Sequence, residues 1–237
     1  MDADLEATID CASERSVLGR LRALGPSAIG MSTGLFDEED WSGQVARATG
    51  WSSAAVELGA YTPGALDSAV AFLRRSPLPI GYVSLHLPFA LDDGGEERLV
   101  GRLDDLESRV AALVQHPDVL TAPELLAPLG RRLVLENMDA RKPGRDVAEL
   151  EPYFRVLPDA GLCLDVAHVK TVDPELKLAH ELLDAFGTRL RELHISGIDE
   201  QCNHLPLDAD AVDSFADVLQ RCRGVPWILE SLPVDAK

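Results

Sequence analysis

Short apolar segments alternate with amphipathic segments along almost the whole chain of 237 residues, and this alternation limits the possible folds more than any other feature. We predict eight strands, at residues 27–32, 54–59, 82–87, 110–116, 132–137, 161–166, 190–196 and 226–231. Several are apolar at successive positions, which is typical of parallel strands that are covered on both faces. Helical patterns separate them, for example at residues 66–75, 96–109, 122–130, 174–186 and 210–222.

Eight strands separated by helices predict an α/β fold, a single (β/α)8 TIM barrel that takes up residues 1–237 as one domain. A doubly wound open sheet would usually have fewer strands and a glycine-rich turn after the first, and MSTGLFDEED has no such motif. Six residues follow the last predicted strand, which is too few for a final helix. We expect the amphipathic segment 4–24 to replace that helix, beside the first and last strands.

Charge and the N-terminal sequence limit the partners of this chain. Its formal net charge is −18, from 40 acidic and 22 basic residues, and such a surface repels nucleic acids. The acidic segment 1–10 lacks the basic-then-apolar layout of a secretory signal, and no apolar run approaches the roughly 20 residues of a membrane span. We therefore expect a cytoplasmic protein that acts on a small-molecule substrate and contacts neither nucleic acid nor a membrane.

The cysteines are widely spaced and form no CxxC motif. They are Cys11, Cys163, Cys202 and Cys222. This spacing favours reduced thiols over a disulfide framework or a zinc knuckle. We interpret Cys163, which falls inside a predicted strand, as a small core residue.

Histidines and carboxylates gather at the ends of the predicted strands. The active site of a barrel forms at the carboxyl ends of its strands. The polar residues at these ends are Glu57, His86, His116, Glu136, Asn137, Asp165, His168, His194, His204 and Glu230. Five of the six histidines belong to this set, and we expect the sixth, His180, on a helix surface. The basic residues Arg141, Lys142 and Arg145 follow the fifth strand and predict a loop near the same site.

Imidazoles and carboxylates together are the donors that Zn²⁺, Mn²⁺ and Fe²⁺ prefer, and they are too rich in nitrogen for Ca²⁺ or Mg²⁺. We expect divalent metal ions here, with zinc first and manganese or iron as alternatives. The set exceeds the three or four protein ligands of one zinc, so two or three metals bridged by carboxylates would use it fully. Without metal, Glu136, Asp165 and Glu230 would repel one another, and one of them would be protonated.

Simpler interpretations exist for single members of the set. His86 can be a hydrogen-bonded core histidine, and His116 can simply end a strand before a proline. A DxxH spacing such as that of Asp165 and His168 is common by chance. Glu136 and Glu230 are harder to explain in this way, because a carboxylate at the end of an apolar strand is costly to bury without a cation.

Five segments, LVLENMD, GLCLDVAH, LRELHIS, CNHLPL and PWILES, resemble those of the xylose isomerase-like TIM barrels, in particular the family-2 AP endonucleases. The resemblance runs from the third to the eighth strand, and the order of the segments is more specific than any one of them. It implies a trinuclear zinc site whose ligands are His86, His116, Glu136, Asp165, His168, His194, His204 and Glu230. Cys202 stands where the family has an aspartate, which weakens the third metal position.

The resemblance implies phosphoester hydrolysis as the first expectation for function. Glu136 and Glu230 would be the catalytic carboxylates that bridge the metals, and Glu230 would orient the attacking water. We expect Glu57, Asn137 and Lys170 to contact the substrate, although Glu57 can instead pair structurally with Lys170 or an arginine. The DNA-inserting loops of the endonucleases are too short or missing, and with the acidic surface this argues against DNA as the substrate.

Three other functions remain open at this stage. A sugar or sugar-phosphate isomerase or epimerase would need only Glu136, Asp165, His194 and Glu230 around one metal, with the two glutamates moving a proton on opposite faces of the substrate. Oxidation at a cluster of iron atoms uses similar ligands in related barrels. A non-catalytic barrel, whose metals stabilise a surface that binds a partner protein, is the third.

Overall fold

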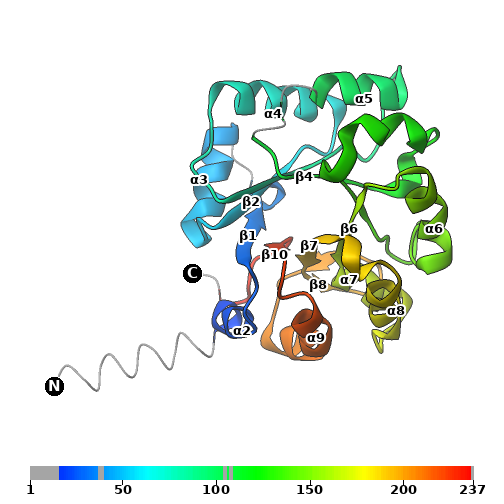
Figure 1. Ribbon diagram of the computed structural model, residues 1–237. Helices are drawn as coiled ribbons and strands as arrows, with labels where there is room; N and C mark the ends of the chain where they lie inside the picture. Colours follow the sequence, from blue (N-terminus) through cyan, green and yellow to red (C-terminus); the bar gives the residue numbers. More distant parts are fainter. Residues whose placement is uncertain (1–15, 37–39, 104–105, 107–108, 236–237) are drawn as a thin grey trace.

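The computed structural model describes residues 16–36, 40–103, 106 and 109–235. Eight parallel strands close into a barrel in the order β1-β10-β7-β6-β5-β4-β3-β2 (Figure 1). They are β1 Ala28–Ser32, β2 Ala55–Gly59, β3 Tyr82–His86, β4 Ala112–Gln115, β5 Leu133–Glu136, β6 Gly161–Asp165, β7 Leu190–Ile195 and β10 Pro226–Leu229. All eight predicted strands are confirmed, and so is the α/β TIM barrel. A short antiparallel ribbon of β8 Gly197–Ile198 and β9 His204–Leu205 follows β7 and was not predicted.

Helices surround the barrel (Figure 1). The α-helices are α2 Val17–Ala23, α3 Trp41–Trp51, α4 Pro63–Arg75, α5 Gly95–Leu103, α6 Val147–Val156, α7 Val166–Val172, α8 Lys177–Phe186 and α9 Ala209–Arg221. The 3-10 segments are η1 Thr33–Leu35, η3 Pro117–Val119, η4 Pro123–Arg132 and η5 Gly187–Arg189. The prediction of an α-helix at 122–130 was wrong: Pro123 and Pro128 lack the amide donors of an α-helix, and the segment forms 3-10 turns instead.

The N-terminal helix α2 lies beside α9, near the C-terminal end of the chain (Figure 1). Arg20 forms an ion pair of 2.8 Å with Asp213 of α9, and the Val17 amide donates to Asp235 Oδ2 at 3.0 Å. Val17 and Leu21 are buried in the main hydrophobic core. The described part of segment 4–24 therefore packs near the last strand, as expected, and residues 4–15 lie outside the described residues.

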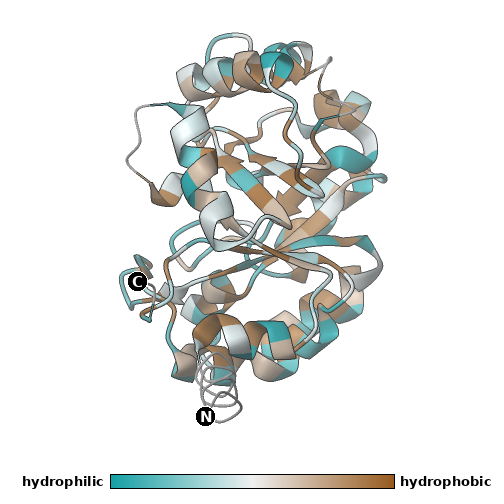
Figure 2. Ribbon diagram, turned by 90° about the vertical axis from the view of Figure 1, so that its left-hand side faces the viewer, coloured by the Kyte–Doolittle hydropathy of each residue, from teal (hydrophilic) through white to brown (hydrophobic). Residues whose placement is uncertain are grey.

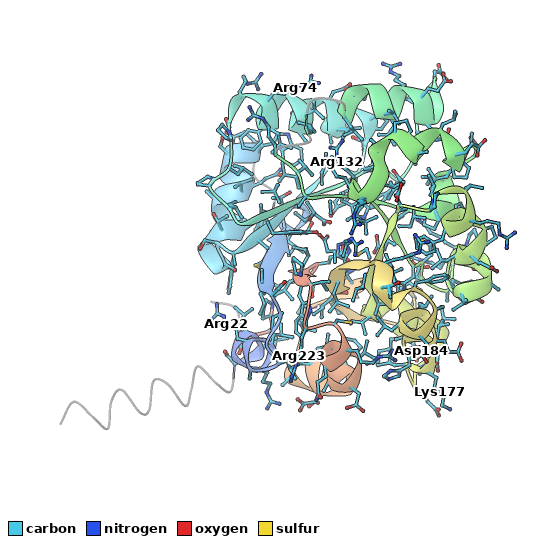
Figure 3. The ribbon with its side chains drawn as sticks, viewed as in Figure 1. Arg22, Arg74, Arg132, Lys177, Asp184 and Arg223 are labelled. Carbon is cyan, nitrogen blue, oxygen red and sulfur yellow. The ribbon has the colours of Figure 1, made fainter. Side chains whose placement is uncertain are left out.

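Two apolar layers hold the barrel together. The main core lies between the strands and the helices, where each helix turns its apolar side inward; Figure 2 shows helices that mix apolar and polar residues around strands that are mostly apolar. The polar sides carry charged residues such as Lys177 and Asp184 of α8, which lie at the outer edge of the molecule (Figure 3). No helix in the described part of the chain is long and apolar enough to cross a membrane.

The barrel interior has a much smaller apolar cluster, formed by Ala112, Val114, Val134 and Cys163. Polar and ionisable side chains fill the rest: Glu57, Ser84, Glu192 and His194 are all fully buried. Branched apolar residues usually dominate the interior of such barrels. The buried ionisable residues of this interior therefore need charged or hydrogen-bonding partners. They lie beneath the group of histidines and carboxylates at the barrel rim.

Candidate metal centre

Glu136, the last residue of β5, lies at the centre of the site and is 1% exposed. Its Oε2 lies 3.2 Å from His86 Nε2 and 3.1 Å from His116 Nε2. Its Oε1 lies 3.4 Å from both His168 Nδ1 and His194 Nδ1. One carboxylate thus contacts imidazoles from four different parts of the barrel rim, which is the arrangement that a shared, bridging ligand requires.

Glu230 lies directly after β10 and is the second carboxylate of the site. Its amide donates to Ile195 O at 3.0 Å, which continues the pairing of β10 with β7 and sets the direction of the side chain. Its Oε1 is 3.3 Å from His194 Nδ1, and its Oε2 is 3.8 Å from His204 Nδ1. His194 Nδ1 therefore lies between Glu136 and Glu230.

Asp165 ends β6 and also caps α7. Its Oδ1 accepts from the His168 amide at 2.7 Å, so the DxxH spacing has a structural cause as well as a chemical one. Asn137 holds the aspartate from the other side: the Asp165 amide donates to Asn137 Oδ1 at 2.8 Å, and Asn137 Nδ2 donates to Asp165 O at 3.0 Å. Asp165 Oδ1 therefore caps the helix, and Asp165 Oδ2 is the oxygen that can bind a metal ion.

These two roles of Asp165 can be separated by substitution. Asp165→Asn keeps an oxygen for the helix cap but removes the anionic metal donor, whereas Asp165→Ala removes both. We expect both variants to lose metal affinity by about 10²-fold or more, beyond the usual effect of an outer-shell partner. In the metal-free state, Asp165→Ala should be about 1 kcal/mol less stable than Asp165→Asn, the usual value of an N-cap. Urea unfolding of the two apoproteins measures the difference, and equal stabilities would contradict the capping role.

At the barrel rim, two groups of donor atoms could each hold a metal ion. Their ligand atoms lie within 4.8 Å of one another in each group. One group is His86, His116 and Glu136; the other is Glu136, Asp165, His194 and Glu230. In the second group, Asp165 Oδ2, His194 Nδ1 and Glu230 Oε2 are buried and have no hydrogen-bond partner within the described part of the chain. Such atoms are costly to bury, and a divalent cation would satisfy all three, so the residues fit a metal ion.

Burial and mutual charge shift the ionisation of these residues strongly. Burial alone would raise the pKa of Glu136, but the charges of His194 and His116 lower it well below its usual value. Burial, together with the charges of Glu230 and Glu136, raises the pKa of Asp165 to about 7 despite the opposing effect of His168. Asp165 is thus partly protonated near neutral pH in the absence of metal.

His86 is held by two hydrogen bonds of different kinds. Its Nδ1 lies 2.9 Å from Leu87 O and its Nε2 3.2 Å from Glu136 Oε2. Burial lowers the pKa of His86, but the hydrogen bond to Glu136 and the charge of Glu57 outweigh it and raise the pKa to about 9. The backbone carbonyl orients the ring so that Nε2 faces the carboxylate, an arrangement common for metal-binding histidines.

Metal binding should therefore become stronger as the pH rises. A metal displaces the protons that His86 and Asp165 carry in the metal-free protein, where their pKa values are about 9 and about 7. Below these values protons compete with the metal, so we expect the affinity to rise by about tenfold per pH unit for each proton displaced, from about pH 6 to about pH 9. Calorimetry in buffers of different ionisation enthalpy measures both the affinity and the protons released. An affinity that does not change with pH would contradict the assigned protonation states.

The remaining predicted ligands, His168 and His204, lie close to the two groups but belong to neither. His168 Nδ1 forms a hydrogen bond of 3.0 Å with the backbone oxygen of Asn137. The ring centroids of His168 and His204 are 5.6 Å apart. His204 is more exposed than the other site histidines, with 35% of its side chain accessible. Cys202 is buried, and none of the three belongs to a group of three or more donors in the described chain. The structure thus assembles donors for two of the three metals that the resemblance implies.

The three residues expected to contact substrate each have protein partners in the structure. Glu57 is fully buried inside the barrel, where its Oε2 lies 3.2 Å from His194 Nε2 rather than near Lys170. The side-chain amide of Asn137 forms two hydrogen bonds with the Asp165 backbone, one through Nδ2 and one through Oδ1. Lys170 lies two residues after His168 on α7, hence on another side of the helix, and its Nζ is 5.2 Å from the Phe215 ring. Contact of these three residues with a substrate stays a prediction.

The structure also brings residues to the site that were not predicted. Glu192 Oε1 lies 2.9 Å from His194 Nε2, and a period of two along β7 was a signal that could have revealed it. Phe89, 44% exposed, stacks between Tyr61 and His116 at centroid distances of 4.6 Å and 4.8 Å. This exposed ring forms an apolar wall beside His116.

The basic loop after β5 does reach the site, through one residue. Lys142 Nζ lies 3.3 Å from His116 Nδ1 and 3.5 Å from Asp118 Oδ2. Arg141 is bound by Asp139 instead. Arg145 is likewise bound by an acidic neighbour, Glu149, at 2.5 Å. Lys142 is therefore the member of this loop that places a positive charge next to the histidines.

Comparison with known proteins shows similarity in structure. No protein-family model and no curated protein sequence matches this chain. The 3-keto-D-glucoside 4-epimerase of E. coli matches with a TM-score of 0.53 at 12% identity, over 88% of this chain and 93% of that one. The D-psicose 3-epimerase of Clostridium cellulolyticum H10 matches with a TM-score of 0.54 at 12% identity, over 89% and 87%. A fusion protein of a xylose isomerase-like TIM barrel and a 4-hydroxyphenylpyruvate dioxygenase matches with a TM-score of 0.50 at 15% identity, over 90% and 40%. At such low identities the comparison establishes a shared fold.

Proposed function

We propose that this chain, which has the xylose isomerase-like TIM-barrel fold, is a metal-dependent isomerase or epimerase of a small sugar or sugar phosphate. The observation that carries the proposal is the group of Glu136, Asp165, His194 and Glu230 at the carboxyl ends of β5, β6, β7 and β10. Two of these residues are glutamates that both lie within 3.4 Å of one imidazole nitrogen, His194 Nδ1. The named neighbours that are single enzymes are both epimerases of sugar substrates, which supports the same conclusion.

A divalent ion held by these four residues would polarise adjacent oxygen atoms of the substrate and make the neighbouring C–H bond more acidic. The protein's own part is the movement of the proton. The pKa values of Glu136 and Glu230 are lowered mainly by His194, against the effect of burial, so both are ionised and can accept a proton. One glutamate would take the proton from carbon; the other, after taking up a proton from solvent, would supply it on the opposite face of the substrate.

The exposed aromatic ring of Phe89, beside His116, could pack against a bound sugar. Phe89 stacks between Tyr61 and His116 and is 44% exposed, so it presents an apolar edge to the site. Sugar rings and chains carry C–H faces that pack against such surfaces, while their hydroxyl groups need donors and acceptors. Lys142, whose Nζ lies 5.6 Å from the Phe89 ring centroid, supplies a donor for a hydroxyl or a phosphate group.

Exchange of a carbon-bound hydrogen with solvent tests this function directly. The metal-loaded protein is incubated in D₂O with a panel of ketopentoses, ketohexoses and their phosphates, and deuterium at the carbon next to the carbonyl is followed by NMR. We expect incorporation with at least one member and its loss on chelation. Full metal loading without exchange on any member of the panel would argue against the proposal.

Phosphoester hydrolysis, the first expectation from the sequence, is kept as the second candidate because of one observation. The group of His86, His116 and Glu136 offers a second metal position that shares Glu136 with the first, and a shared carboxylate is typical of two-metal hydrolases. The structural comparisons support the isomerase alternative rather than this one. Cleavage of a phosphodiester that requires two equivalents of metal would favour hydrolysis, whereas exchange that is complete at one equivalent would favour isomerisation.

A further inference from the structure

Below the metal centre, the barrel interior holds another group of donor atoms. Cys163 and Glu192 are direct partners in the register of β6 and β7, next to the pair of Asp165 and His194. Cys163, Glu192 and His194 are fully buried, and one donor atom of each lies within 4.8 Å of the other two. A thiol, a carboxylate and an imidazole thus meet in a place that solvent does not reach.

Glu57 contacts one member of this group, His194, from β2, which β1 and β10 separate from β7 in the barrel. Its Oε2 lies 3.2 Å from His194 Nε2, and Glu192 Oε1 lies 2.9 Å from the same nitrogen. Two buried carboxylates therefore share one imidazole nitrogen, which carries at most one proton. The other nitrogen of the same ring already faces Glu136 and Glu230. The negative charge around His194 exceeds what its ring can balance.

Several polar atoms beside these carboxylates are also unsatisfied. Oε1 of Glu57, Oε2 of Glu192 and Oγ of Ser84 are buried and have no hydrogen-bond partner among the described residues. Two buried carboxylates that share one imidazole nitrogen are unfavourable, and a cation bound between them would stabilise both.

We propose that Cys163, Glu192 and His194, with Glu57 beside them, form a second, fully buried site for a thiophilic divalent cation such as Zn²⁺. Sulfur, imidazole nitrogen and carboxylate oxygen are the donors of zinc sites, and four of them close a tetrahedral structural site. With the Cys163 thiolate, the two carboxylates more than balance the charge of the cation. Binding would release the thiol proton of Cys163 to solvent, and His194 would bind through Nε2 as a neutral imidazole with its proton on Nδ1. With a metal at Nδ1 as well, the ring would lose that proton to solvent too and bridge the two sites as an imidazolate.

A site closed by protein donors has a structural role rather than an open position for substrate. This one would connect β2, β6 and β7 through the inside of the barrel, where the small apolar cluster provides little packing. It would also orient His194 from behind. The inference therefore goes beyond the proposed isomerase activity and does not depend on it.

Cobalt substitution tests the site, because a thiolate bound to Co²⁺ gives a charge-transfer absorption in the near ultraviolet. The chain has four cysteines, so the triple variant Cys11→Ser, Cys202→Ser, Cys222→Ser leaves Cys163 alone. We expect the metal-free triple variant, titrated with Co²⁺, to show this absorption. Adding Cys163→Ser should abolish it and lower the cobalt bound at saturation by about one equivalent.

Other results would overturn the proposal. Wild-type protein saturated with Co²⁺ but lacking the sulfur absorption would show that Cys163 is not a ligand, and that Glu57 and Glu192 only orient His194. An absorption that survives Cys163→Ser and disappears in Cys202→Ser would place the sulfur ligand in the loop after β7. If the variants fail to fold, X-ray absorption of the zinc-loaded wild type decides, through a sulfur neighbour at about 2.3 Å. Deuterium exchange on the same samples tests the isomerase proposal separately, since either result can occur without the other.

Discussion

Glu136→Gln is expected to lower the rate of deuterium exchange by about 10³-fold and to weaken metal binding at both upper groups. Glu136 contributes an oxygen to each group and contacts four histidine rings, at 3.1 to 3.4 Å. Glutamine keeps the size of the side chain but removes its charge and presents an amide to at least one imidazole. The variant thus loses a metal ligand and a proton acceptor together, and this effect should be the largest of any single substitution.

The measurement is metal content after dialysis, combined with the NMR exchange assay. Glu151→Gln is a matched control: it is the same chemical change on α6, at an exposed side chain that pairs only with Arg155 among the contacts we describe. The control should behave as wild type in both assays. A Glu136→Gln protein that kept two equivalents of metal would show that the two groups do not share this carboxylate.

Glu230→Gln is expected to separate exchange from interconversion. If Glu136 and Glu230 serve opposite faces of the substrate, the variant retains the acceptor for one epimer and lacks the group that completes the reaction on the other face. Net interconversion should fall by about 10³-fold, while the hydrogen of one epimer still exchanges with solvent at a measurable rate. The metal should bind more weakly but still bind, because Glu136, Asp165 and His194 remain.

Starting the reaction from each epimer in turn, at saturating metal, measures this asymmetry. Glu200→Gln, an exposed glutamate in the loop after β8, is the matched control and should leave both rates unchanged. Equal loss of exchange from both epimers would mean that Glu230 acts only as a metal ligand. Full interconversion in Glu230→Gln would remove it from the proton transfer altogether.

Most of the barrel was predictable from local pattern. Each of its eight strands is a short apolar run between turn residues, and burial on both faces leaves a signal that does not depend on distant contacts. The ribbon of β8 and β9 was not predicted, because each strand has two residues, which are too few to show the alternating pattern of a β-strand. The segment at 122–130 has helical periodicity, but its prolines exclude the α-helix that this periodicity suggests.

The candidate site was predictable to the extent that it depends on strand ends. Glu136, Asp165 and Glu230 lie at or directly after the last residue of their strands, and parallel strands in a closed barrel end at one rim. Lys170 shows the limit of this reasoning. It stands close in sequence to His168, but the rotation of α7 turns it toward α9.

The order of residues in this chain was enough to define a (β/α)8 barrel and to place a set of imidazoles and carboxylates at its rim, because strand period and strand end are local properties. Closure of the barrel was needed to show which of these atoms meet. Glu57 and Glu192 are 135 positions apart in sequence, yet both contact His194 Nε2 once β10 pairs with β1. Local patterns carry no information on distances across the barrel, and those distances decide whether buried charges share a cation.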